Sequence, residues 1–267
     1  MKTVFYILIA LLLMSSCQKD SSWQLTKTID LDTITPIGLA IEGASLWVAD
    51  GDNNRVVHLS LNGEIKKAYE GFERPMHLAV KGNTVFIPEY GADQITKFDG
   101  KTKKTLVLQD SLDAPAGISL WEQEYAIADF YNHRILYFNG TETITFGEEG
   151  KTEGLFYYPT DVQLTKDKIF VADAYNNRVQ VFDKKGQFIK VIGTEEKMNA
   201  ATGLGVSETQ LFVTDFENDR VLIYNLEGTL QQIIEEGLEK PTDVFIDKNL
   251  LYIANYKGKN LMVYNHK

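Results

Sequence analysis

Short runs of alternating apolar and polar residues recur along the chain at intervals of about 40 residues. In each unit an apolar alternation such as Ile37, Leu39 and Ile41 follows a proline, and a polar turn and a second apolar run such as 46–49 come next. A third run and a weaker fourth run complete the unit, so each unit predicts four short strands. Repeats of this length and strand number are typical of propeller blades, which need neighbours on both sides to bury their faces.

The second strand of each unit ends on an acidic or amide residue, always at the same distance from the start of the first strand. The starts are Pro36, Pro75, Pro115, Pro159, Ala201 and Pro241, and the ends are Asp50, Glu89, Asp129, Asp173, Asp215 and Asn255. Successive ends are separated by 39, 40, 44, 42 and 40 residues. The sequence therefore predicts an all-β fold with six four-stranded blades.

The last unit has too few residues for a fourth strand, because the chain ends at 264–267 after three runs. An isolated strand-like segment, 23–29, precedes the first proline. We expect this segment to supply the missing strand of the sixth blade and to close the ring. One propeller domain over 23–267 follows, and no linker or low-complexity run divides it.

Four of the units carry a motif that resembles the repeat core of NHL-repeat β-propellers. The matching stretches are VADGDNNRV from Val48, IADFYNHRI from Ile127, VADAYNNRV from Val171 and VTDFENDRV from Val213. The connector FGEEGKTEGLFYYPTDV, 146–162, is similar to the spacer between repeats of that family, whereas units two (IPEYGADQI) and six (IANYKGKNL) depart from the pattern. The resemblance implies a six-bladed propeller. It implies no activity, because propellers of this kind serve as enzymes, RNA binders and protein-binding modules alike.

The first residues predict an exported lipoprotein. Lys2 precedes an apolar run, 4–14, that is too short for a stable membrane span, and Met14-Ser15-Ser16-Cys17 follows. This end resembles the lipobox of bacterial lipoproteins, which implies cleavage before Cys17 and acylation of its thiol. The segments are then a signal peptide, 1–16, and a lipidated tether, 17–22. An ordinary secretory signal with an incidental cysteine is the alternative.

The tether predicts an orientation on the membrane. Gln18 stands where an inner-membrane retention signal of the bacterial type has Asp, so we expect the outer membrane, with the leaflet undecided. The closing strand, from Trp23, runs upward from the bottom face, only six residues after Cys17. The bottom face is therefore expected to face the membrane. The top face, with the strand starts and the turns after the acidic ends, should point away from it.

Net charge limits the partners. The formal charge is −10, and such a surface repels phosphate backbones, so no nucleic-acid partner is expected. The aspartates at four strand ends recur with Arg55, Arg134, Arg178 and Arg220, and a catalytic set should break this symmetry. We therefore expect these residues to form structural turn and inter-blade pairs. The chain contains no G-x-S-x-G, H-E-x-x-H or phosphate-loop motif, and no catalytic residue is assigned.

Symmetry does break at the second residue after each start. Glycine occupies this position in units one, three and five, and His77, Asp161 and Asp243 occupy it in units two, four and six. The three side chains are expected near the axis, at the mouth of the central channel, where one imidazole and two carboxylates could bind Zn²⁺ or Ca²⁺. The alternative is ordinary repeat variation, with the aspartates bonded to loop backbone. The zinc-binding amidating-lyase branch of this fold is disfavoured, because only His77 is suitably placed.

Aromatic residues break the symmetry of the top face. Eight of them follow the strand ends or enter from the longest connector: Tyr90, Phe130, Tyr131, Tyr157, Tyr158, Tyr175, Phe216 and Tyr256. The same connector is expected to bring Phe156 to this face. Exposed aromatics favour recognition surfaces, and an envelope protein or a carbohydrate are both suitable partners. The sequence predicts a non-enzymatic binding scaffold without a cofactor. The alternative is a metal-dependent hydrolase or lyase at the channel mouth.

Overall fold

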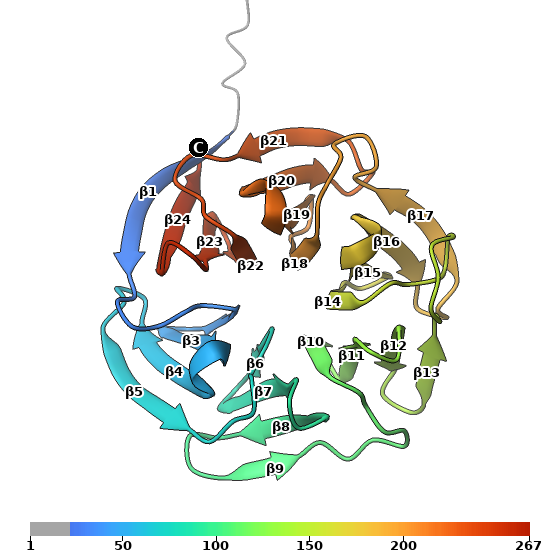
Figure 1. The fold of residues 1–267 in the computed structure, drawn as a ribbon, viewed down its shortest axis with the longest axis horizontal. Helices are drawn as coiled ribbons and strands as arrows, with labels where there is room; N and C mark the ends of the chain where they lie inside the picture. Colours follow the sequence, from blue (N-terminus) through green and yellow to red (C-terminus); the bar gives the residue numbers. More distant parts are fainter. Residues whose placement is uncertain (1–21) are drawn as a thin grey trace, which may run out of the picture.

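The computed structural model describes residues 22–267, so the predicted signal peptide and Cys17 lie outside the described residues. Six antiparallel sheets of four strands surround a central axis (Figure 1). This arrangement confirms the predicted six-bladed propeller. Over 22–267, no helix has the length and apolar character needed to cross a membrane.

The first three blades run from residue 38 to residue 146, each from an innermost to an outermost strand. Blade 1 contains β2 (Gly38–Glu42), β3 (Ser45–Asp50), β4 (Arg55–Ser60) and β5 (Ile65–Glu70). Blade 2 contains β6 (Ala79–Lys81), β7 (Thr84–Glu89), β8 (Gln94–Phe98) and β9 (Lys103–Thr105). Blade 3 contains β10 (Pro115–Trp121), β11 (Glu124–Asp129), β12 (Arg134–Phe138) and β13 (Thr143–Phe146).

The other three blades complete the ring. Blade 4 contains β14 (Pro159–Leu164), β15 (Lys168–Asp173), β16 (Arg178–Asp183) and β17 (Phe188–Ile192). Blade 5 contains β18 (Ala201–Val206), β19 (Gln210–Asp215), β20 (Arg220–Asn225) and β21 (Leu230–Ile234). Blade 6 contains β22 (Pro241–Asp247), β23 (Leu250–Asn255) and β24 (Asn260–His266), and β1 (Trp23–Asp30) is its outermost strand.

Closure by the N-terminal strand is confirmed. β1 pairs antiparallel with β24 from Trp23 opposite His266 to Asp30 opposite Asn260, with one register shift between Leu25 and Lys27. Trp23 also contacts blade 5, where its indole lies edge-on to Phe212 with 5.4 Å between ring centroids. The ring is therefore held by the sheet of blade 6 and by side chains of the preceding blade.

The hydrophobic core lies between neighbouring blades, because each sheet has two faces to cover. Phe170 and Val179 of blade 4, for example, belong to one buried cluster with Leu204 and Leu222 of blade 5. Tyr252 of blade 6 is likewise part of a buried cluster that spans blades 6 and 1. These contacts position the inner strands around the axis and leave the two ends of the ring to the connections.

The repeated Asp and Arg residues tie each turn to the connector before its own blade. Asp173 is fully buried, and its carboxylate accepts hydrogen bonds from Arg178 Nε at 2.8 Å and from the Tyr157 backbone N–H at 2.8 Å. Arg178 also donates to the Thr152 carbonyl, and Asn176 Nδ2 donates to Asp173. The expectation of pairs between blades was wrong, since each Asp–Arg pair lies within one blade. The equivalent pairs in blades 1, 3 and 5 have the same geometry.

Blade 2 departs from the repeat because of a proline. β6 begins only at Ala79, four residues after Pro75, which forms a single bridge with Glu89. The residue that would pair with His77 is Pro88, which has no N–H to donate to the ladder. The His77 N–H donates to the Ala116 carbonyl of blade 3 at 3.1 Å. His77 is therefore held against the neighbouring blade, at the axis.

Candidate functional site

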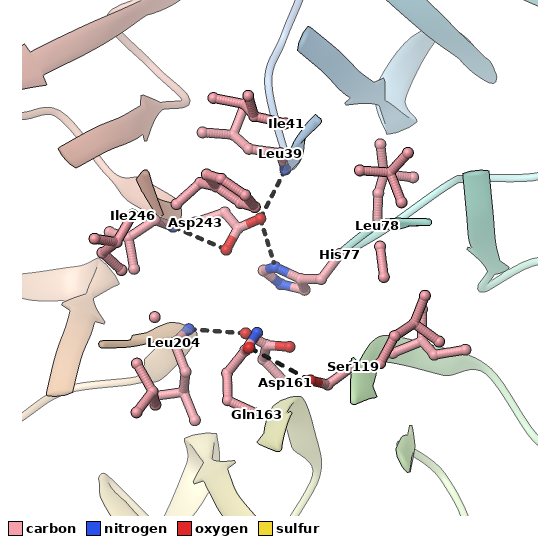
Figure 2. A pocket seen from close by; sticks show the side chains of 18 residues that line it. Leu39, Ile41, His77, Leu78, Ser119, Asp161, Gln163, Leu204, Asp243 and Ile246 are labelled. Atoms are coloured by element: carbon pink, nitrogen blue, oxygen red, sulfur yellow. Dashed lines mark hydrogen bonds and ion pairs between the residues drawn. The ribbon is translucent and has the colours of Figure 1, made fainter. Parts of the chain in front are cut away.

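The three polar side chains predicted near the axis do converge there. One ligand atom each from His77, Asp161 and Asp243 can be chosen so that all three lie within 4.8 Å of one another (Figure 2). The exposed fractions of these residues are 3%, 1% and 4%. The structure therefore brings together an imidazole and two carboxylates from alternate blades, in a buried position. We call this set the axial triad.

Glycines in the other three blades make room for the axial triad. A Cβ on Gly38 would lie 2.8 Å from the His77 Cα, one on Gly117 would lie 2.9 Å from the Asp161 Cα, and one on Gly203 would lie 2.7 Å from the Asp243 Cα. These distances are too short for any side chain. The glycines of the alternation are thus a packing requirement: the backbone of each polar residue lies against a glycine of the preceding blade.

Backbone N–H groups fix the orientation of both carboxylates. Asp243 accepts from Val244 at 2.8 Å and, across the blade boundary, from Leu39 at 2.7 Å. Asp161 accepts from Val162 and from Leu204 of blade 5, both at 2.8 Å. The alternative stated for the aspartates, bonding to backbone, is therefore observed. Each carboxylate oxygen accepts one backbone hydrogen bond and has a further lone pair.

His77 completes the triad without a hydrogen bond of its own at Nδ1. Nδ1 lies 3.5 Å from Asp243 Oδ2, which is too long for a good N–H···O bond, and this nitrogen is buried without a hydrogen-bond partner. Burial lowers the pKa of His77, but the carboxylates of Asp243 and Asp161 outweigh this effect and raise it above the ordinary value. Burial raises the pKa of Asp161 to about 7. The site therefore takes up protons readily.

A narrow cavity extends from the axial triad toward the bottom face. Its volume is about 180 Å³, and its walls are mostly apolar residues of the inner strands, such as Leu39 and Ile118. Below the triad the cavity is lined by two polar residues that sequence reasoning missed, Ser119 and Gln163 (Figure 2). The distance between Ser119 Oγ and Gln163 Oε1 is 3.5 Å. Their position in the repeat, two residues after that of the triad, could have identified them as inward-facing.

A wider hollow opens on the bottom face itself. It has a volume of about 930 Å³ and is lined by turns of blades 3 to 6 together with Trp23 and His266. Trp121, at the end of β10, is 38% exposed at its rim. The described chain therefore begins next to this hollow, on the bottom face.

Six of the eight aromatic residues predicted on the top face form one continuous cluster. Neighbouring ring centroids in this aromatic cluster lie between 4.6 and 6.4 Å apart. Its members come from blades 2, 3 and 4: Tyr90, Phe130, Tyr131, Tyr157, Tyr158 and Tyr175. Tyr131 and Tyr175 are 48% and 60% exposed, and the other four are half-buried beneath or beside them.

The remaining aromatic residues lie elsewhere. Phe216 and Tyr256 form a separate pair in blades 5 and 6, and the Tyr256 hydroxyl donates to Asp52 of blade 1 at 2.7 Å. The placement of Phe156 on the top face was wrong. Its side chain is fully buried between blades 3 and 4, 5.4 Å from the ring of Phe182, because alternate residues of this segment face the core.

His133 is a member of the aromatic site that the sequence did not identify. Its ring stacks on Tyr157 with an angle of 5° between the planes, and its Nδ1 accepts the Tyr158 N–H at 3.1 Å. The substitution of a repeat Asn by His was the available signal. His133 thereby fixes the connector that supplies two of the rings.

The sequence was compared with known families, curated proteins and solved structures. The profile of a family described as a 6-bladed beta-propeller, DUF5128, matches residues 148–267, which form blades 4 and 5, three strands of blade 6 and the connector before blade 4. No curated protein matches the sequence.

Many solved structures share the fold at low identity. A gluconolactonase from Xanthomonas campestris superposes with a TM-score of 0.74 at 14% identity, over 92% of this chain and 95% of that one. A catalytically inactive virginiamycin B lyase from Staphylococcus aureus, solved with quinupristin, gives 0.66 at 15%, over 92% and 88%. A chain of a nidogen/laminin complex gives 0.67 at 19%, over 79% and 86%. At these identities the likeness shows the fold alone, and that fold is used by enzymes and by protein-binding modules.

Proposed function

We propose that this protein is a lipid-anchored binding module of the bacterial cell envelope, with an NHL-type propeller that recognises a protein partner through its top face. The observation that carries the proposal is the continuous aromatic cluster on that face. Tyr131 and Tyr175 leave much of their rings exposed on a rigid support of packed rings. Exposed tyrosines with little freedom to lose are the residues that dominate protein interfaces.

The charge of the top face favours a cationic partner. The connections at this end are the turns between second and third strands and the connectors between blades, and they carry 16 Asp and Glu against 6 Lys and Arg, apart from the four Asp–Arg pairs. The connections at the bottom end carry 7 acidic and 5 basic residues. Acidic surroundings steer a basic surface toward the rings and speed its association.

The geometry of the rings supports a protein rather than a carbohydrate partner. Tyr131 contacts Tyr90, Phe130 and Tyr158 at inclined or edge-on angles of 56°, 79° and 85°. A ridge of tilted rings presents edges and hydroxyl groups, and the tyrosine hydroxyls can accept hydrogen bonds from Lys and Arg side chains. A carbohydrate would instead need an open ring face on which to stack.

Anchoring through Cys17 would orient the top face relative to the membrane. The described chain begins at the bottom end, beside Trp23, so a short lipidated tether would hold that end against the membrane and present the aromatic cluster away from it. Residence in the outer membrane follows from Gln18 if the lipobox is used. Acyl chains stabilise such attachment by ~0.8 kcal/mol per buried CH₂.

A metal-dependent hydrolase or lyase is the second candidate, and one observation favours it: the axial triad. Two features place it second. The cavity of about 180 Å³ is smaller than the ~300–1,000 Å³ pockets that usually hold small-molecule substrates. Each carboxylate oxygen of Asp161 and Asp243 also accepts a backbone N–H, which suits a fixed structural group better than a proton-transferring one.

Removing the two exposed tyrosines tests the binding function. The variant Tyr131→Ala/Tyr175→Ala should fold normally, because both side chains are largely exposed. It should lose partner capture from gently solubilised membranes by at least ~30-fold, since an aromatic anchor typically contributes 2 kcal/mol or more. Quantitative co-purification with the affinity-tagged native protein, followed by titration of the purified partner at low and high salt, measures both the loss and the charge dependence.

A matched control removes exposed apolar side chains away from the top face. Ile65 and Ile189 are 53% and 45% exposed on the outer strands β5 and β17, so Ile65→Ala/Ile189→Ala should retain full capture. Equal capture by the tyrosine variant and the native protein would overturn the proposal. A partner that proves to be a glycan would replace the protein assignment.

A further inference from the structure

Two buried carboxylates face the propeller axis with too little positive charge around them. Asp161 and Asp243 are 1% and 4% exposed. Among the described residues that line the cavity, none is Lys or Arg, and His77 is the one side chain that can carry a positive charge. Burying an ionised carboxylate is costly unless it is paired or binds a metal. Close backbone contacts explain why glycine occupies the alternate positions, but they do not explain why these positions hold ionisable residues.

His77 supplies an independent indication of a ligand. Its Nδ1 atom is buried and without a hydrogen-bond partner, and the ring points between the two aspartates (Figure 2). Buried polar atoms in folded proteins are almost always satisfied. An unpartnered imidazole nitrogen aimed at two carboxylates is the arrangement expected for a ligand set.

We propose that His77 Nδ1 and the carboxylates of Asp161 and Asp243 bind one divalent transition-metal ion of the zinc class on the propeller axis. The site goes beyond the proposed binding function and does not depend on it. Its ion would connect blades 2, 4 and 6, which are not neighbours in the ring.

The spacing of the donor atoms suits a small four-coordinate ion. Zinc bonds of ~2.0–2.2 Å place two tetrahedral ligands about 3.4 Å apart. The distance between His77 Nδ1 and Asp243 Oδ2 is 3.5 Å, which matches this spacing. One ligand atom from each of the three residues can be chosen so that all lie within 4.8 Å of one another, so a small approach of the side chains completes the set.

The donor chemistry distinguishes zinc from calcium and magnesium. One imidazole and two carboxylates form a mixed N/O set with three protein ligands, which leaves one position for water. Calcium takes six to eight oxygen ligands, and magnesium requires octahedral oxygen coordination. Neither requirement is met by a buried set that includes an imidazole.

The surrounding backbone holds the carboxylates as supporting groups do in metal sites. The Leu39 and Leu204 N–H groups each reach across a blade boundary to a triad aspartate, at 2.7 and 2.8 Å. Such hydrogen bonds orient ligating carboxylates and are part of most metal sites. The ligands are therefore preorganised, because the packing of the blades already orders their side chains.

Metal content of the purified full chain tests the inference. The protein is extracted in detergent, freed of metal with a chelator and dialysed separately against excess Zn²⁺, Mn²⁺ or Ca²⁺, and bound metal is measured by elemental analysis. We expect close to one equivalent of Zn²⁺ per chain and none of Ca²⁺. Bound zinc should also raise the melting temperature, because an ion that binds only the folded state stabilises it.

Two variants separate the axial site from incidental zinc binding. His77→Gln should lower zinc affinity by more than about 100-fold, since the loss of an outer-shell partner alone typically costs 10–100-fold. His58→Gln is the matched control, because His58 Nε2 is also buried without a partner but lies outside the carboxylate set. This control should bind zinc as the native protein does, and far-UV circular dichroism verifies that both variants fold.

A measurement on the native protein keeps the test decisive if His77→Gln does not fold. Co²⁺ in the site should give the visible absorption bands of a four-coordinate ion, and added Zn²⁺ should remove them. The inference is overturned if the native protein takes up no transition metal, if it takes up only Ca²⁺, or if His77→Gln binds zinc as tightly as the control.

Discussion

Ring closure by the N-terminal strand makes Trp23 the most sensitive residue of that strand. Its indole is 6% exposed, lies 5.4 Å from Phe212 and 4.9 Å from His266 between ring centroids, and donates from Nε1 to Gln210 at 3.1 Å. Gln232 bonds both the N–H and the carbonyl of Trp23, at 2.9 Å each. These contacts join the outermost strand of blade 6 to blade 5.

The expected cost of Trp23→Ala follows from those contacts. Replacement of a buried Trp by Ala typically costs 3–5 kcal/mol, and the lost indole hydrogen bond of ~1 kcal/mol is part of that total. Leu25, on the same strand, is 46% exposed, so Leu25→Ala should change the free energy of unfolding by no more than about 0.5 kcal/mol. The comparison separates the latch at Trp23 from general effects of altering the strand.

Urea unfolding followed by far-UV circular dichroism measures the difference. Fluorescence is less suitable, because Trp23 is one of three tryptophans. A lower midpoint with an unchanged slope would show a loss of stability without loss of compactness. Deletion of residues 23–30 is the stronger perturbation: it exposes the edge of β24 and should cause aggregation or loss of cooperative unfolding. Trp23→Ala within 1 kcal/mol of the native protein, or a deletion variant that melts normally, would refute the closure argument.

The remaining predictions concern the anchor and the protonation of the axis. Cys17→Ala should abolish labelling by a fatty-acid probe and release the protein from the membrane fraction; unchanged labelling would exclude the lipoprotein assignment. In chelator-treated protein, the folded-state pKa of about 7 for Asp161 and the raised pKa of His77, both beside Asp243, mean that the folded state holds more protons than the unfolded one. The free energy of unfolding should then fall as pH rises, by about 2–3 kcal/mol between pH 5 and 8 for Asp161 alone. Asp161→Asn should remove this contribution of Asp161 to the pH dependence. Identical pH profiles for the variant and the native protein would refute the prediction.

The fold was predictable because its determinants are local and repeated. The 14-residue spacing from start to end of a strand pair fixes the hairpin register, and the same register occurs between Pro159 and Asp173, Ala201 and Asp215, and Pro241 and Asn255. Closure was predictable from the shortage of residues in the last unit. What the pattern did not give was the effect of Pro88, which removes a donor from the ladder and shortens β6.

The sites were only partly predictable, because they depend on contacts between units. The convergence of the axial triad followed from its position in the repeat, but the cavity below it depends on the packing of six inner strands. Phe156 and Tyr157 are adjacent in the sequence and face opposite ways, into the core and toward the aromatic cluster. His133 supports that cluster by accepting a hydrogen bond from the Tyr158 N–H, 25 residues away, and no local pattern indicates this bond.

The two departures from symmetry differ in what packing can explain, and this difference decides how each is interpreted. Alternation of glycine with a larger residue at the axis has a steric cause, since a Cβ on Gly203 would meet the Thr242 carbonyl at 2.2 Å. The aromatic side chains of Tyr131 and Tyr175 have no such cause, because about half of each is exposed and smaller residues would fit the same turns. Packing therefore does not require aromatic side chains at these two positions, and the rings are available to bind a partner. At the axis, packing accounts for the alternating glycines, and the ionisable chemistry of His77, Asp161 and Asp243 is what the proposed metal site would explain.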